Sequence, residues 1–260
     1  MATFTSGGLE IAYDDIAPTG EAAGTAVLIH GFATNRAEMW RRLGWYGALE
    51  RKGYRTIALD LRGHGESAKP RDPADYGGAA LLADVLELMN HLGVRRAHLM
   101  GYSMGARLAL QMALAQPDRV DHLILGGVGG RILAGGHDED EGPRMTMAEA
   151  MAAESAEAIP DPTLRGFRLF AESQGEDLAA LAAFCRASVA PLEAADLGRL
   201  AAPSLVVAGA HDALIGDPQD LAYAIPGARL TILPGCDHFS AIAHALYKGA
   251  VFDFLEGWLD

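Results

Sequence analysis

A serine stands where the sequence predicts an abrupt turn from a strand into a helix. The run Gly101-Tyr-Ser-Met-Gly105 follows a short apolar stretch over residues 97–101 and leads into residues 104–116, which are apolar nearly all round. A serine on such a turn is held in a strained backbone conformation, with its hydroxyl projecting outward. The positions two residues before and after it must be small, because the turn leaves no room for a Cβ, and both are glycine. The pattern therefore predicts Ser103 as a nucleophile.

A serine hydroxyl is a weak nucleophile, so it needs a base to take its proton and a carboxylate to orient that base. The expected order along the chain is serine, acid, histidine. A predicted strand over residues 204–208 runs into a loop that ends at Asp212, and one over residues 229–233 runs into a loop that ends at His238. Both side chains thus follow the carboxyl ends of strands, the edge at which open α/β sheets bind ligands and at which Ser103 also lies. We expect His238 as the base and Asp212 as the acid.

Three other aspartates lie near predicted strand ends. Asp237 is next to His238 and cannot easily orient its neighbour's ring, so it is interpreted as a turn residue. Asp60 also ends a strand, but it precedes the serine in the chain and begins a turn. Asp217 is the nearest substitute for Asp212.

Acyl transfer also needs N–H donors for the charge that develops on the carbonyl oxygen. One donor is expected to be the backbone N–H of Met104, directly after Ser103. The second is expected from the loop His30-Gly-Phe32, after the first core strand, and we place it at the N–H of Phe32. His30 is a rival base, but the better position of His238 favours a structural role for His30, in which it hydrogen-bonds the loop.

Short apolar runs alternate with helical patterns along most of the chain. Buried strands are predicted at residues 26–30, 55–60, 97–101, 122–126, 204–208 and 229–233, after two short strands around Gly7 and Gly8 within residues 4–17. Helices are predicted at residues 36–52, 79–92 and 104–116. Strands this short and continuously apolar are typical of a sheet buried on both faces. The predicted fold class is therefore α/β, with a mostly parallel sheet.

The alternation stops between residues 129 and 199, where three helical stretches, 145–158, 164–173 and 176–188, occur without a convincing strand. We interpret residues 129–199 as a helical cap inserted into a core domain made of residues 1–128 and 200–260. The acidic run at 137–141 is interpreted as a solvated loop. Apolar side chains of the cap can form the ceiling of a pocket. We expect substrate contacts from Phe167, Phe170 and Phe184.

Composition excludes several classes of partner. The 260 residues include 21 Lys plus Arg and 34 Asp plus Glu, which gives a net charge of −13. This acidic balance argues against a nucleic-acid partner and against docking on anionic lipid. No Cys/His cluster has zinc spacing and no Gly-rich phosphate loop is present, so neither a metal nor an organic cofactor is expected. Two cysteines, no signal peptide and no apolar run near about 20 residues favour a cytoplasmic protein. The oligomeric state stays open.

Four motifs together resemble the α/β-hydrolase superfamily. They are His30-Gly-Phe32, Asp60-Leu-Arg-Gly-His-Gly-Glu-Ser67, Gly101-Tyr-Ser-Met-Gly105, and the pair Gly209-Ala-His-Asp212 with Gly235-Cys-Asp-His238. The resemblance extends from about residue 4 to residue 258 and is weakest in the insertion. It implies an eight-stranded, mostly parallel sheet with an antiparallel second strand, and a helical cap after the sixth strand. It also implies a Ser103–His238–Asp212 triad with Phe32 and Met104 as oxyanion donors. The segment 60–67 is a marker of the fold and is not expected to be catalytic.

The resemblance implies a serine hydrolase that cleaves small carboxylic esters through an acyl-enzyme. Members that hydrolyse epoxides or carbon–halogen bonds use an Asp nucleophile, and the serine at position 103 speaks against both. Three other reactions of the same triad stay open: a lactonase, a carbon–carbon bond hydrolase or a perhydrolase, with which Phe32 is compatible. The Ser-Gly-rich oxyanion loop expected of carbon–carbon hydrolases is replaced by Ala33-Thr-Asn-Arg36. A ligand-binding receptor with slow turnover is the alternative outside enzymes.

Overall fold

The computed structural model describes residues 2–133, 145–187 and 192–258. The acidic run predicted at 137–141 and the last residue of the helix predicted at 176–188 lie outside these ranges. None of the helices within them is long and apolar enough to cross a membrane.

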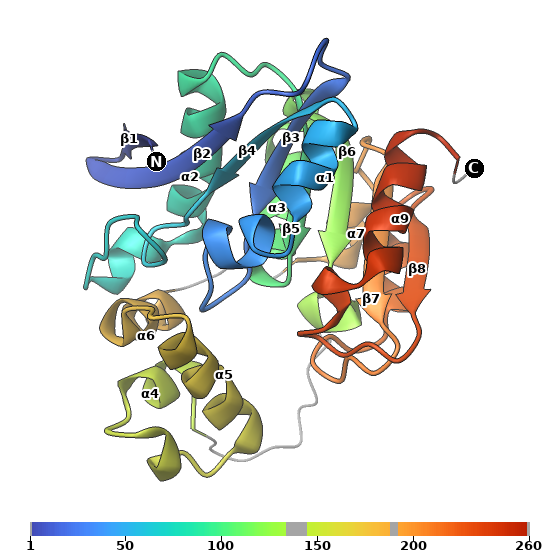
Figure 1. The fold of residues 1–260 in the computed structure, drawn as a ribbon. Coiled ribbons are helices and arrows are strands. Elements are labelled where there is room, and N and C mark those ends of the chain that lie inside the picture. The colour runs from blue at the N-terminus through green and yellow to red at the C-terminus, as the bar shows by residue number, and fades with distance from the viewer. Residues whose placement is uncertain (1, 134–144, 188–191, 259–260) are drawn as a thin grey trace.

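Eight strands of the described residues form one sheet, in the spatial order β1-β2-β4-β3-β5-β6-β7-β8 (Figure 1). The strands are β1 (Ala2–Ser6), β2 (Leu9–Ile16), β3 (Gly24–Ile29), β4 (Tyr54–Leu59), β5 (Ala97–Tyr102), β6 (Val120–Gly126), β7 (Ser204–Gly209) and β8 (Arg229–Leu233). Strand β2 is antiparallel to both of its neighbours, and every pair from β4 to β8 is parallel. The predicted eight-stranded, mostly parallel sheet with an antiparallel second strand is confirmed.

The central strands are mainly apolar because helices cover both faces of the sheet. Successive side chains of a strand point to opposite faces. In β3, Val27 and Ile29 belong to one buried cluster, and Leu28, between them, belongs to the other. This two-sided burial explains why the strands show as continuous apolar runs in the sequence.

Each buried cluster is closed by its own set of helices (Figure 1). On one face lie α2 (Gly78–His91), α3 (Met104–Ala115) and α8 (Pro218–Ala224). On the other face lie α1 (Trp45–Arg51) and α9 (Ala245–Leu255). The short α7 (Ala194–Leu197) contributes Leu197 to the first face.

The helix predicted over residues 36–52 is interrupted. A π-helical turn at Ala37–Arg41 is separated from α1 by Gly44, whose φ of 75° lies in the left-handed region. Glycine adopts that conformation without strain, so the chain changes direction there. The apolar spacing across 36–52 reflects two short segments that face the same core, with Trp40 and Trp45 in contact.

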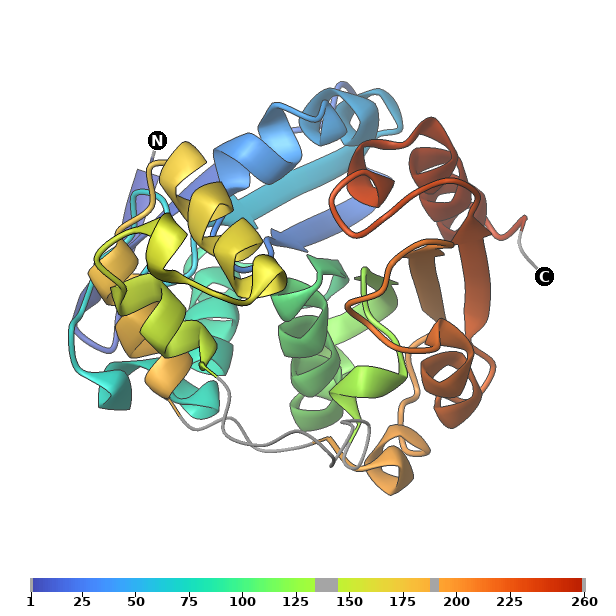
Figure 2. The ribbon, with the colours of Figure 1, turned by 90° about the horizontal axis from the view of Figure 1, so that it is seen from below.

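Three helices form a separate layer over the carboxyl ends of the strands (Figures 1 and 2). They are α4 (Met147–Ala152), α5 (Pro162–Ser173) and α6 (Leu178–Arg186). Side chains cap all three N-termini: Thr146 in a capping box, Asp161 and Asp177. The helix predicted at 145–158 ends early, at Ala152.

The first residues of the predicted cap belong to the core. The N–H of Gly130 donates to the carbonyl of Asp217 at 2.8 Å, and the N–H of Arg131 donates to that of Ile215 at 2.9 Å. The described part of the helical layer therefore begins after these residues, at about position 145.

Polar contacts hold the turn between α5 and α6 to loops of the core. The carboxylate of Glu176 accepts hydrogen bonds from the side-chain amide of Asn35 at 2.9 Å and from the N–H of Gly65 at 2.8 Å. Asp177 forms a two-pronged ion pair with Arg71, at 2.5 and 2.6 Å. Burial raises the pKa of Glu176, because desolvation disfavours the carboxylate. The hydrogen bonds from Asn35 and Gly65 stabilise the carboxylate and offset part of that cost.

Candidate active site

Ser103 lies on the turn between β5 and α3, in a conformation that few side chains adopt. Its φ is 53° and its ψ is −116°. A Cβ added to Gly101 would overlap the carbonyl of Gly105, and one added to Gly105 would overlap the carbonyl of Ile29. The requirement for two glycines, predicted from the motif, is thus confirmed, and the strain at Ser103 is imposed by close packing on both sides.

His238 and Asp212 meet Ser103 at the carboxyl edge of the sheet. The Oγ of Ser103 lies 3.0 Å from the Nε2 of His238, and the Nδ1 of His238 lies 2.7 Å from Oδ2 of Asp212. The side chain of Asp212 is fully buried, and that of His238 is 8% exposed. With Nδ1–H donating to the carboxylate, Nε2 carries the lone pair that can accept the serine proton.

The loop that carries His238 is fixed from several sides. The hydroxyl of Tyr102, the residue before Ser103, donates to the carbonyl of His238 at 2.5 Å. Asp237 accepts from the N–H groups of Phe239 and Ser240, and the Ser240 hydroxyl lowers the pKa of the Asp237 carboxyl. Asp237 is therefore a turn residue, as its position predicted.

The remaining candidates have structural partners. His30 is fully buried, receives the N–H of Leu61 on its Nε2 at 3.0 Å, and contacts the carbonyl of Gly31 through Nδ1. Burial lowers the pKa of His30, which keeps it neutral. Asp60 binds the guanidinium and the backbone N–H of Arg36. Asp217 caps α8 by accepting from the N–H of Gln219 at 2.9 Å.

The backbones expected to supply oxyanion donors lie beside the serine. A Cβ added to Gly31 would lie 3.6 Å from the Cβ of Ser103, so the loop that continues into Phe32 runs against the nucleophile. Met104 is the first residue of α3, where backbone N–H groups have no partner within the helix. Both positions suit donors that point at an oxyanion bound to Ser103.

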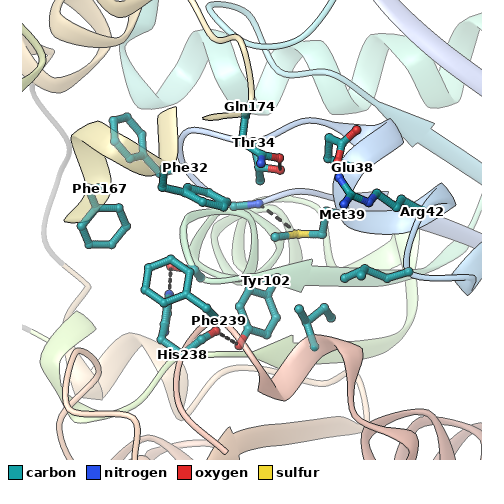
Figure 3. A pocket seen from close by; sticks show the side chains of 15 residues that line it. Phe32, Thr34, Glu38, Met39, Arg42, Tyr102, Phe167, Gln174, His238 and Phe239 are labelled. Carbon is teal, nitrogen blue, oxygen red and sulfur yellow. Dashed lines mark hydrogen bonds and ion pairs between the residues drawn. The ribbon is translucent and has the colours of Figure 1, made fainter. Parts of the chain in front are cut away.

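A cavity of about 270 Å³, the first cavity, opens directly on Ser103 (Figure 3). Its walls are mainly apolar and include Met39, Leu43, Tyr102, Phe239 and Ile242. Figure 3 shows Phe167 and Phe239 at the end of the cavity that holds His238, and Glu38 with Arg42 at the opposite end.

Two of the three cap phenylalanines reach the first cavity. Phe167 and Phe170 of α5 line it, and both rings contact Phe239. Phe184 does not belong to its walls. Its ring packs against Phe32, His64 and Tyr76, so the structure places Phe184 against the loop that carries Phe32 and not in the cavity. The sequence indicated an apolar side chain of the cap and could not tell which neighbour it meets.

Sequence reasoning did not identify Tyr102, Phe239 or Met39 as part of the site. Tyr102 and Phe239 are chain neighbours of Ser103 and His238, and that adjacency was the available signal. Met39 accepts the N–H of Gly31 on its sulfur at 3.4 Å, but its spacing matched only the packing face of a helix. Among the described residues, no group of three or more His, Cys, Asp or Glu side chains is placed to hold a metal ion.

Comparisons with known proteins agree with this architecture. Residues 26–144 match the model of the alpha/beta hydrolase fold family. The chain is 32% identical over 259 residues to a proposed carbamate hydrolase of Variovorax paradoxus, covering 90% of this chain and 91% of the relative. It is 30% identical to a 2-hydroxy-6-oxononadienedioate/2-hydroxy-6-oxononatrienedioate hydrolase of Pseudomonas putida, covering 95% and 92%.

Among solved structures, the enol-lactonase of Burkholderia xenovorans LB400 superposes with a TM-score of 0.78, at 26% identity, over 98% of this chain and all of the other. The protein is a hydrolase of the α/β class. It belongs to the α/β-hydrolase fold family, as the four motifs indicated. Membership in this family implies a small-molecule substrate.

Proposed function

We propose that the protein is a serine hydrolase that cleaves small carboxylic esters, with Ser103 as nucleophile, His238 as base and Asp212 as its orienting acid. The carrying observation is the continuous chain of hydrogen bonds from the serine hydroxyl through the imidazole to a buried carboxylate, at 3.0 and 2.7 Å. A neutral imidazole held in that orientation is what an unactivated hydroxyl needs in order to attack.

The reaction proceeds in two halves. Ser103 Oγ attacks the acyl carbon while its proton passes to Nε2 of His238, and the carboxylate of Asp212 stabilises the resulting imidazolium. The N–H groups of Phe32 and Met104 bind the oxyanion of the tetrahedral intermediate. His238 returns the proton to the leaving alcohol, which gives an acyl-enzyme. Water then attacks the acyl carbon while His238 takes its proton, and His238 returns that proton to Ser103 Oγ as the carboxylic acid leaves.

The test uses a chromogenic short-chain ester together with a fluorophosphonate that labels activated serines. The wild-type protein should turn over the ester and be labelled at Ser103. The Ser103→Ala variant should keep its fold and lose both, since removing the serine of such a triad costs on the order of 10⁶-fold in kcat. Labelling elsewhere, or a tenth of the activity left in the variant, would show that the nucleophile is another residue.

A lactone is the second candidate substrate, because the enol-lactonase named above covers nearly the whole chain at 26% identity. A lactone is a cyclic ester, and the same steps open it without releasing an alcohol. The carbamate hydrolase and carbon–carbon hydrolase relatives are reasons to test a carbamate and a ring-cleavage product as substrates as well. A protein that is labelled at Ser103 but turns over none of these compounds, while binding them, is a receptor.

The helices over the strand ends are proposed to act as a cap that sets substrate choice. Phe167 and Phe170 support this role because they bring α5 to the wall of the first cavity. We also propose a cytoplasmic location, which the two free thiols, Cys185 and Cys236, support.

A further inference from the structure

The first cavity changes in character along its length. Its walls beside Ser103 are mainly apolar. Four polar side chains line its other end: Thr34, Glu38, Arg42 and Gln174. Figure 3 shows these four on the side away from His238, with Phe32 and Met39 between them and the imidazole. The arm of a substrate that is held at Ser103 and extends into this cavity therefore runs along apolar walls and meets hydrogen-bonding groups at its tip.

A buried hydroxyl lies at the polar end of the cavity. Thr34 belongs to the loop after β3 and is only 2% exposed. Its Oγ1 donates to Oε1 of Gln174, the residue after α5, at 3.4 Å, which is long for a hydrogen bond between two oxygens. None of the described residues donates a hydrogen bond to the Thr34 oxygen, which has two lone pairs. The Thr34 hydroxyl therefore keeps unused capacity to accept.

The half-buried amide of Gln174 has unused capacity as well. Within the described part of the chain, its Nε2 donates only to the hydroxyl of Ser173, at 3.3 Å, which leaves one of its two N–H groups free. Figure 3 shows the side chains of Thr34 and Gln174 pointing toward each other. A single group that both donates and accepts can thus bind the Thr34 oxygen and the Gln174 amide at once.

The two charged residues at this end cancel each other. Nη1 of Arg42 donates to the carboxylate of Glu38 at 2.6 Å, across one helical turn. The side chains are 71% and 34% exposed, so solvent screens the pair. A charged substrate tip would meet one attractive and one repulsive partner and would lose part of its hydration. This end of the cavity therefore suits a polar tip without charge.

We propose that the substrate arm in the first cavity is apolar along its length and ends in a hydroxyl group, which binds Thr34 and Gln174. This inference rests on the proposed function, since it places the ester carbonyl at Ser103. A hydroxyl donates to the Thr34 oxygen and accepts from the Gln174 amide. A methyl tip would shield both groups from water without replacing the hydrogen bonds they lose. The arm belongs either to the acyl chain or to the alcohol, and the experiment separates these two sources.

The experiment uses straight-chain methyl esters from pentanoate to octanoate, and the esters in which a hydroxyl or an ammonium group replaces the terminal methyl. Alkyl acetates with the same three tips place the change on the alcohol arm. Acid release, with the rate without enzyme subtracted, gives kcat/KM for each. At one chain length of one series, the hydroxyl ester should exceed the methyl ester by about tenfold, and the ammonium ester should fall below the hydroxyl ester.

Thr34→Val replaces the hydroxyl by a methyl of similar size and should reduce that preference at least about fivefold. Thr34→Ser, which keeps a hydroxyl, should reduce it less, and Gln174→Met should reduce it as well. The matched control is Thr56→Val. Thr56 on β4 is fully buried, its Oγ1 has no partner among the described residues, and it does not line the first cavity, so the preference should stay unchanged.

Two results would overturn the inference through the ester series. One is equal kcat/KM for the methyl and hydroxyl esters at every length in both series, or a preference that survives in both Thr34→Val and Gln174→Met. The other is an ammonium ester that is faster than the hydroxyl ester, which would make Glu38 the group that binds the tip.

Labelling of Ser103 separates this inference from the proposed function. Fluorophosphonates with alkyl chains of the same lengths, ending in a methyl or in a hydroxyl, replace the esters. Faster labelling by a hydroxyl probe, lost in Thr34→Val, without hydrolysis of any ester would sustain the inference and reject the ester hydrolase. Ester hydrolysis without preference between the tips, in esters and probes alike, would do the reverse. If no probe labels Ser103, both are rejected.

Discussion

The ring of Phe239 lies 5.8 Å from the ring of Phe167, between centroids, and this contact joins the loop of His238 to helix α5. Phe239 also contacts Phe170 and the imidazole of His238. The helical layer and the loop of His238 are therefore linked through one aromatic cluster at the wall of the first cavity (Figure 3).

Phe167→Ala should shift the preferred ester chain length upward. Phe167 lines the first cavity and also a cavity of about 330 Å³ that opens on Ser103 as well, and its removal joins the two. Each further methylene that the enlarged space accepts adds about fourfold in kcat/KM, from about 0.8 kcal/mol of burial. The measurement is a profile of p-nitrophenyl esters from acetate to octanoate.

The matched control for this profile is Phe184→Ala. Phe184 packs against His64 and Tyr76, so its loss should lower the free energy of unfolding by about 2–3 kcal/mol and leave the preferred length unchanged. Profiles that only scale together in both variants would mean that core loops determine specificity.

Asp212→Asn should lower kcat by about 10⁴-fold while Ser103 can still be labelled slowly, since the asparagine holds the wrong tautomer of His238. Asp217→Asn is the control, because Asp217 only caps α8 and asparagine is an equally good cap. Full activity in Asp212→Asn, with loss in Asp217→Asn, would move the acid to position 217.

Glu176→Ala should lower the free energy of unfolding by about 1–3 kcal/mol. The substitution removes the carboxylate that accepts hydrogen bonds from the side-chain amide of Asn35 and from the N–H of Gly65. Arg71→Met, which breaks the more exposed pair with Asp177, should cost less than about 1 kcal/mol. Urea unfolding measures both. A larger loss in Arg71→Met would show that the ion pair holds the turn between α5 and α6.

His98→Phe should reduce the acid sensitivity of stability. Burial, with a smaller effect of His122, lowers the pKa of His98 from 6.5 to about 4. Between pH 6.5 and pH 4 the imidazole is protonated in the unfolded chain but stays neutral in the folded protein. The free energy of unfolding is therefore highest above pH 6.5 and falls as the pH decreases toward 4. The loss from this group is on the order of 3 kcal/mol. Urea unfolding at pH 7 and pH 5 in both proteins checks the slope, and an unchanged slope in the variant would contradict the assignment.

The sequence determined the local features around the proposed nucleophile. Glycines on both sides of Ser103, an apolar strand before it and a buried helix after it specify the strained turn, because each requirement is met within 20 consecutive residues, 97–116. The continuous apolar runs likewise specified strands buried on both faces. Asp212 and His238 could be chosen because strand order alone places both at the carboxyl edge of the sheet.

Tertiary structure decided which side chains meet. Phe167, Phe170 and Phe184 have equal standing in the sequence, yet only the first two reach the first cavity, since the packing angle of each helix sets where its rings point. Arg107 and Arg131 stand on different elements and line one cavity beside Ser103 only because β5 and β6 are adjacent strands. Such relationships depend on the register and crossing of distant elements, which no local pattern encodes.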